Sequence, residues 1–159
     1  MIYYVDSYYL KIFLLNYSMG ATISIPKVNY EDIQTGIENN SIYLIHTFQI
    51  NEENCLIDKS IHSQQEEHII NQLLKTTNKS ANIVIYGKNT NDESIIKKYN
   101  QLMQLGFKNV YVYPGGMFEW LLLQDIYGKE LFPTTNEEND ILKYKPLKKL
   151  YNRYITNSL

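Results

Sequence analysis

Two short loops carry the residues whose type and position could support chemistry. The first loop directly follows the apolar run at residues 83–86, and it consists of Gly87, Lys88, Asn89, Thr90, Asn91 and Asp92. The second, at residues 114–116, follows the apolar run at 110–113 and contains two glycines. Backbone N–H groups of such loops can bind a small anion, and the Lys88 ammonium would add to the attraction. We therefore predict a ligand-binding loop at Gly87 to Asp92.

The segment between these loops has the pattern of one amphipathic helix. Its apolar residues recur at spacings of three and four, and Gly106 follows them where a helix needs a left-handed residue; they are Ile95, Ile96, Tyr99, Leu102, Met103 and Leu105. A strand, a helix and a strand in this order predict a βαβ unit in a parallel sheet. Ligands of such sheets bind beyond the carboxyl ends of the strands, which is where both loops lie.

The rest of the chain continues this α/β pattern. We expect further helices at residues 29–38, 64–75 and 117–124, and a further strand at 42–45. The predicted domain covers residues 25–127, with an N-terminal extension at 1–24 and a C-terminal extension with a basic tail at 128–159. The tail from Lys143 to Arg153 has the pattern of a short amphipathic helix packed on the domain.

Composition excludes several classes of protein. The chain is 44% hydrophobic and 20% charged, with a formal net charge of -2, which does not indicate a nucleic-acid-binding protein. The single cysteine, Cys55, cannot form an intrachain disulfide, so we expect a reducing intracellular compartment, the cytoplasm. The sequence has no Cys-x-x-Cys motif or His/Cys cluster, and we predict neither a metal nor a cofactor.

The N-terminal residues leave membrane association open. Residues 1–18 are apolar but interrupted by Asp6 and Lys11, and they fall short of a membrane-spanning helix. Met19 and Gly20 begin an N-myristoylation pattern, which applies only if Met19 is the initiator; otherwise Gly20 is an internal turn glycine. Acylation of Gly20 together with the basic tail would be enough to hold the chain at a membrane surface.

The order of these segments resembles the rhodanese-like domain, a single-domain sulfurtransferase fold. The most specific part of the resemblance is the sequence Asn-Val-Tyr-Val-Tyr-Pro-Gly-Gly-Met-Phe-Glu-Trp at residues 109–120. It is similar to the last core strand of the family, its glycine pair and the helix that follows. The resemblance extends over about residues 25–120 and implies an open, mainly parallel sheet of about five strands with helices on both faces.

The same resemblance implies an altered active site. The family carries its catalytic cysteine directly after the strand at 83–86, where this chain has Gly87, and glycine offers no nucleophile. Asp92 and Glu93 stand where an arginine is expected, although they also suit the N-terminus of the next helix. His46 replaces the family's acid, and Phe48 replaces a basic residue.

We therefore expect a catalytically inactive rhodanese-like domain that works by binding a protein partner or a small anion. Two alternatives remain. One is an active sulfurtransferase or related phosphatase that uses Cys55, although a buried structural cysteine explains this residue more simply. The other is a membrane-peripheral adaptor held by Gly20 and the basic tail.

Overall fold

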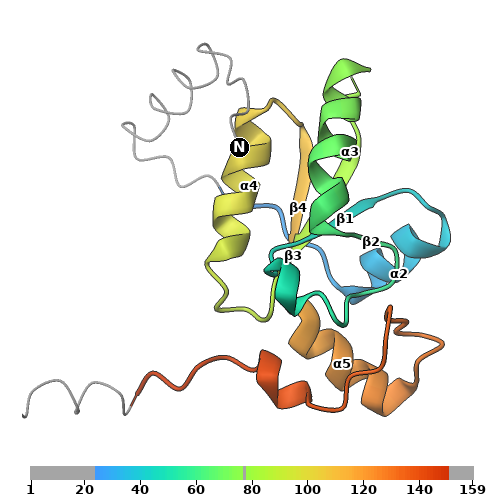
Figure 1. Ribbon diagram of the computed structural model, residues 1–159, viewed down its shortest axis with the longest axis vertical. Helices are drawn as coiled ribbons and strands as arrows, with labels where there is room; N and C mark the ends of the chain where they lie inside the picture. The colour runs from blue at the N-terminus through green and yellow to red at the C-terminus, as the bar shows by residue number, and fades with distance from the viewer. Residues whose placement is uncertain (1–23, 77, 151–159) are drawn as a thin grey trace, which may run out of the picture.

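The computed structural model describes residues 24–76 and 78–150 and contains four parallel strands and four α-helices (Figure 1). The strands are β1 (Tyr43–His46), β2 (Ser60–Ile61), β3 (Asn82–Tyr86) and β4 (Asn109–Tyr113). The helices are α2 (Tyr30–Glu38), α3 (Ser63–Lys75), α4 (Ser94–Gln104) and α5 (Gly116–Tyr127). Two short 3-10 helices are η1 (Ile50–Glu52) and η2 (Ile141–Tyr144).

The sheet confirms the predicted α/β class. Its strands lie in the order β2-β1-β3-β4 and every pairing is parallel. The strand number is close to the expected five: a single parallel bridge between Lys27 and Val112 adds an isolated pairing beside β4. The two-residue strand β2 was not predicted, because two residues show no period of alternation.

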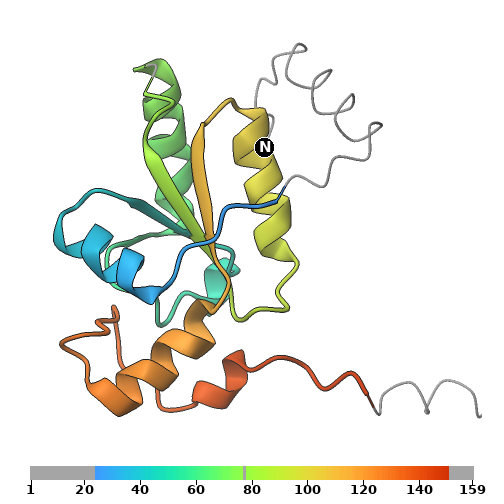
Figure 2. The same cartoon turned by 180° about the vertical axis from the view of Figure 1, so that it is seen from behind.

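The helices cover both faces of the sheet, as predicted (Figure 2). Side chains alternate along a strand, so Ile83 and Ile85 of β3 point to one face while Val84 and Tyr86 point to the other. The Ile83 face packs against α3 and α4, and the Val84 face packs against α2 and α5. Apolar side chains on both faces of β3 are what a buried parallel strand requires.

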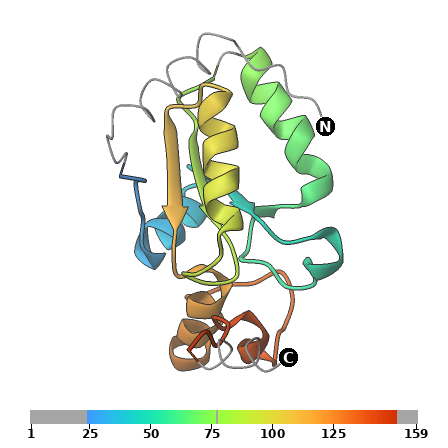
Figure 3. The ribbon, with the colours of Figure 1, turned by 90° about the vertical axis from the view of Figure 1, so that its left-hand side faces the viewer.

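The carboxyl ends of the strands face the end of the molecule where α5 and the following residues gather (Figure 3). The segment after α5 contributes Phe132 and Tyr144 to the core, each 2% exposed. Phe132 packs edge-on against Trp120 at 5.1 Å, and the Trp120 indole N–H donates to the carbonyl of Pro133. The C-terminal segment therefore covers the end of the sheet where a ligand site is expected.

The structure corrects one expectation about the tail and leaves others open. Residues 145–150 are not helical, so the amphipathic helix predicted from Lys143 onward is wrong over that range. Pro146 lies within it and cannot contribute a backbone donor to a helix. Gly20 and residues 1–18 lie outside the described residues, and the domain boundaries at 24 and 127 stay predictions. Within the described ranges, no helix combines the length and apolarity needed to cross a membrane.

Candidate functional site

The loop between β3 and α4 lies at the carboxyl end of the sheet and begins with Gly87. Thr47, the residue after β1, lies beside it: the Thr47 N–H donates to the Tyr86 carbonyl at 3.1 Å. The Thr47 hydroxyl is 2.6 Å from the hydroxyl of Ser94, the first residue of α4. The ends of two neighbouring strands and the start of a helix thus meet around Gly87, where the sequence predicted a site.

The carboxylate of Asp92 turns back into this loop and accepts three hydrogen bonds. One oxygen accepts the Lys88 backbone N–H at 2.9 Å. The other accepts the Ser94 N–H at 3.1 Å and the Ser94 hydroxyl at 2.5 Å. The two backbone donors flank the carboxylate, one from the start of the loop and one from the first turn of α4. Asp92 therefore satisfies the N–H of the first α4 residue and also fixes the loop, whereas Glu93, the N-cap residue, makes no side-chain capping bond, unlike the prediction that both acids cap the helix.

Asp92 also fills the space beside Gly87. A Cβ atom added to Gly87 would collide with one Asp92 carboxylate oxygen and would lie 2.9 Å from the Asp92 Cγ. The Thr47 hydroxyl oxygen would be another 2.9 Å contact. A Cβ atom at these distances would force the Asp92 carboxylate or the Thr47 hydroxyl to move. The Asp92 carboxylate can lie at this position because Gly87 has no side chain.

The backbone at the start of α5, which follows the glycine pair after β4, contacts the Gly87 loop. Gly116 has φ of +61°, and a Cβ there would lie 2.5 Å from the Gly87 carbonyl oxygen and 3.0 Å from the Asn89 nitrogen. Only glycine allows both this conformation and this close backbone approach. The N–H groups of Met117 and Phe118 donate to the carbonyls of Gly87 and Lys88, both at 2.9 Å. The start of α5 therefore fixes the first two residues of the loop.

Three of the four remaining predicted loop residues, Lys88, Asn89 and Asn91, have partners within the protein. The Lys88 ammonium pairs with Glu52 at 2.6 Å, and this bond lowers the pKa of the Glu52 carboxyl. Asn89 is 8% exposed: its amide donates to the Tyr144 carbonyl at 2.7 Å, and its side-chain oxygen accepts the Asn91 N–H at 3.0 Å. Thr90 is exposed. Asn89 thus ties the loop to the C-terminal segment.

An open cavity of about 500 Å³ lies between the loop and that segment. Three parts of the chain form its walls: the residues after β1, the β3–α4 loop, and the segment around Tyr144. All but one of its lining residues are of polar or charged type, with both charges present, although their carbon atoms form much of the surface; they are Thr47, Gln49, Glu52, Lys88, Asn89, Asn91, Asp92, Glu93, Ser94, Lys143, Lys145, Leu147 and Lys149. A ligand in this cavity would contact the loop and the tail together.

Comparison with known proteins identifies the fold family. Residues 34–123, more than half of the chain, match the family model described as the rhodanese-like domain. The chain belongs to the rhodanese-like domain family. A search of curated protein sequences finds no significant match. The loop at Gly87 lies within the matched residues, whereas the tail residues that line the cavity lie beyond them.

Solved structures of this family share the fold at low sequence identity. The Alr3790 protein from Anabaena sp. has a TM-score of 0.51 at 19% identity, covering 73% of this chain and 97% of that chain. A yeast protein tyrosine phosphatase of the rhodanese family has a TM-score of 0.54 at 12% identity, covering 76% and 99%. A thiosulfate sulfurtransferase from Pseudomonas aeruginosa has a TM-score of 0.50 at 13% identity, covering 69% and 20%. These similarities support the fold alone.

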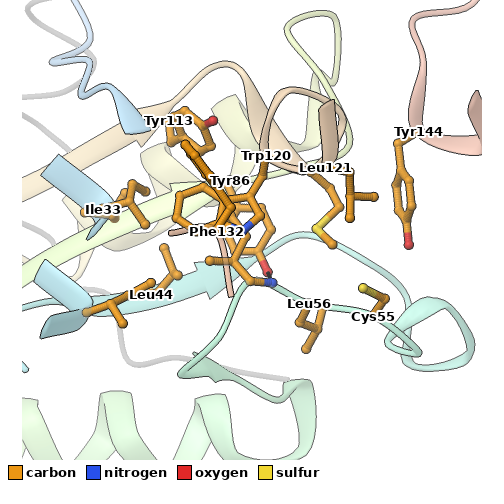
Figure 4. Packing of buried hydrophobic residues seen from close by; sticks show 14 of the residues in the cluster. Ile33, Leu44, Cys55, Leu56, Tyr86, Tyr113, Trp120, Leu121, Phe132 and Tyr144 are labelled. Atoms are coloured by element: carbon orange, nitrogen blue, oxygen red, sulfur yellow. Dashed lines mark hydrogen bonds between the residues drawn. The ribbon is translucent and has the colours of Figure 1, made fainter. Parts of the chain in front are cut away.

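The only cysteine of this rhodanese-like domain is buried away from solvent. Cys55 is 1% exposed and belongs to the same buried cluster as Leu56 and Tyr144 (Figure 4). Its thiol donates to the Asn136 carbonyl at 3.0 Å, and burial raises the pKa of the thiol. A reactive cysteine needs exposure and a lowered pKa, so this environment is that of a structural cysteine.

His46, at the end of β1, is a buried neutral histidine. Its Nδ1 atom accepts the Phe48 N–H at 3.2 Å, so the proton is on Nε2, which lies 3.7 Å from a Glu53 carboxylate oxygen. Burial lowers the pKa of His46 to about 4, although Glu53 partly opposes the shift. Glu53 also bonds His62 and the Ser63 N–H, both at 3.1 Å. His46 therefore supports the loop after β1 and is not a charged group at neutral pH.

Sequence reasoning missed four residues that shape the site: Thr47, Glu52, Ser94 and Tyr144. Thr47 could have been found, since it follows the strand next to β3 and carboxyl ends of parallel strands meet at one edge. Glu52 and Tyr144 have no local signal, because the fold brings them to the loop from distant parts of the chain. Phe48 was noted only as a departure from the family; it packs against the Tyr144 ring at 5.8 Å.

Proposed function

We propose that this chain is a catalytically silent rhodanese-like domain that acts by binding. The observation that carries this proposal is the Asp92 carboxylate in the space beside Gly87. Gly87 directly follows β3, where the family carries its cysteine. In an active member, the amides of this loop would surround a thiolate or the sulfur bound to it. Here the Lys88 N–H of the loop and the Ser94 N–H of α4 hold a carboxylate of the protein.

Cys55 is the only thiol of the chain, and its environment argues against a catalytic role. Sulfur transfer and phosphate-ester hydrolysis through a cysteine both need an accessible thiolate, because the thiolate is the attacking species. Cys55 is buried, its thiol is engaged with the Asn136 carbonyl, and burial raises its pKa. These three features argue against the alternative in which Cys55 serves as the nucleophile.

Binding would take place at the open cavity beside the loop. The family domain supplies one wall through Asn91 and Glu93, and the tail supplies the other through Lys145, Leu147 and Lys149. Asn89 holds the two walls together through its hydrogen bond to the Tyr144 carbonyl. A protein partner that contacts both walls is the ligand we favour, because the lining mixes both charges with the exposed apolar side chain of Leu147.

The test is a side-by-side assay of thiosulfate:cyanide sulfur transfer and of phosphate-ester hydrolysis. Wild type, Cys55→Ser and Gly87→Cys should all remain at the background rate. Gly87→Cys should stay inactive because its new side chain collides with Asp92, which also opposes ionisation of a nearby thiol. Turnover by the wild type that disappears in Cys55→Ser would overturn the proposal and establish the enzyme alternative.

A further inference from the structure

We propose that two copies of this chain associate by exchanging their C-terminal residues, so that the tail at residues 145–150 of each copy docks on the outer face of α5 in the other. The outer face of α5 is formed by five exposed side chains, the last of them just beyond the helix: Leu122, Asp125, Ile126, Tyr127 and Glu130. The inference goes beyond the proposed function, because it names a second copy as a partner and holds whether or not the chain is catalytically silent.

The exposed apolar surface of the described residues is concentrated near the C-terminus. In that part of the chain, seven of the ten exposed large hydrophobic side chains lie within residues 122–150. Only three of the twelve residues of α5 are polar, and one of these, Gln124, is buried. A helix that packs on a domain normally turns a polar face outward, whereas Ile126 of α5 is 69% exposed. Such a gathering of exposed apolar side chains indicates an interaction site.

The two surfaces carry opposite charges. Residues 116–140, from α5 to the start of η2, contain six acidic residues and one lysine, a formal charge of -5. Residues 141–150 contain four lysines and no acidic residue, a formal charge of +4. Within the described ranges, four charged residues of the two surfaces take part in no ion pair: Asp125, Glu130, Lys145 and Lys149. The tail and the outer face of α5 are therefore complementary in charge as well as apolar.

The tail does not cover the outer face of α5 in its own chain. After η2, residues 145–150 run away from the C-terminal end of α5, and the two opposite views agree on this direction (Figure 1 and Figure 2). Leu147 is 81% exposed and Leu150 is 72% exposed, so their own chain leaves both side chains uncovered. The outer face of α5 in a second copy offers them an apolar surface.

An exchange of tails would bury both surfaces twice. Each copy carries one tail and one outer face of α5, so a pair with twofold symmetry makes two identical contacts and closes. The leucines of the tail would supply the apolar contact, and its lysines would lie near Asp125 and Glu130. Because salt screens such exposed charges, the dimer should weaken as the ionic strength rises.

Charge reversal followed by mixing tests the exchange. Sedimentation velocity of the full chain compares wild type with a tail variant, Lys145→Glu with Lys149→Glu, and with an α5 variant, Asp125→Lys with Glu130→Lys. Wild type should form dimers, and each variant alone should dimerise with a Kd at least about tenfold higher. An equimolar mixture should dimerise as wild type does, because the reversed tail meets the reversed face while the native tail meets the native face.

Matched variants separate the contact from general effects of charge. Lys97→Glu with Lys108→Glu changes the net charge as the tail variant does, at exposed positions outside both surfaces, and should dimerise as wild type. Leu147→Ser and Ile126→Ser each remove an exposed apolar side chain from one of the two surfaces. Each should raise the Kd of dimerisation by about tenfold without lowering the thermal midpoint of the monomer.

A wild type that stays monomeric at every concentration, or a mixture of the two charge-reversed variants that stays monomeric, would overturn the inference. Binding of a monomeric wild type to anionic vesicles that is lost in the tail variant would assign the tail to a membrane surface and would also overturn it. Catalytic silence is tested by turnover, so a monomeric wild type would leave that proposal unchanged.

Discussion

The buried neutral histidine at the end of β1 predicts a specific pH dependence of stability. His46 is 3% exposed, and burial lowers its pKa from 6.5 to about 4, with Glu53 partly opposing and His62 and Lys98 adding to the decrease. At pH values between about 4 and 6.5, His46 binds a proton in the unfolded chain but not in the folded chain. The free energy of unfolding must therefore fall as the pH falls through this window and must be fully restored above it.

The size of this effect follows from the shift. A pKa change from 6.5 to about 4 corresponds to about 3 kcal/mol of stability. About 2 kcal/mol of this should be lost between about pH 7 and about pH 4.5. Glu52 and Glu53 also have lowered pKa values, but their protonation destabilises the fold mainly below this window. The contribution of His46 to the pH dependence of stability can therefore be separated from those of Glu52 and Glu53.

Urea unfolding across this pH range, for wild type and His46→Asn, measures the effect. The asparagine side-chain oxygen can accept the Phe48 N–H in place of Nδ1, and asparagine does not titrate. The variant should be less stable at neutral pH but should lose about 2 kcal/mol less on acidification. Parallel pH profiles for the two proteins would refute the assignment of His46 as a buried neutral group.

Two further predictions concern the loop support and the thiol. Gly116→Ala should lower the free energy of unfolding by about 1–3 kcal/mol in urea titrations, because Gly116 has φ of +61° and the added methyl would press on the Gly87 carbonyl; unchanged stability would contradict this packing. A thiol reagent should modify Cys55 only as fast as the protein opens, since the side chain is 1% exposed. Labelling at the rate of a free thiol in the native state would show that Cys55 is accessible.

Most of the fold was predictable because its elements carry strong local periodicity. The helix expected at 64–75 is α3 (Ser63–Lys75), and the strand expected at 110–113 is β4 (Asn109–Tyr113). The tail was predicted less well. Phe132 and Tyr144 are core residues in a segment without an apolar period, because single side chains fill gaps left by the rest of the fold. Such packing depends on the folded structure as a whole, so local sequence patterns do not predict it.

The location of the candidate site was predictable, but its internal arrangement was not. The rule that ligands bind beyond the carboxyl ends of parallel strands predicts a site at the Gly87 loop, and the structure places this loop at that edge of the sheet. The sequence also suggested that Asp92 and Glu93 cap α4, but only Asp92 accepts the N–H of the first helical residue, and Glu93 makes no side-chain capping bond. It could not show that the same carboxylate reaches back to the Lys88 N–H, because this depends on the backbone path of the loop. The contact of Asn89 with Tyr144 spans 55 residues and has no local signal.

The central claim is that the chain is catalytically silent, with a carboxylate instead of a sulfur nucleophile in the loop after β3, and sulfur loading tests this silence most directly. Intact-mass measurement of the native wild-type protein after incubation with thiosulfate reports any sulfur bound covalently to the chain. We predict an unchanged mass, because Gly87 has no side chain and Cys55 is buried with a raised pKa. A mass increase of one sulfur atom that disappears in Cys55→Ser would contradict the claim.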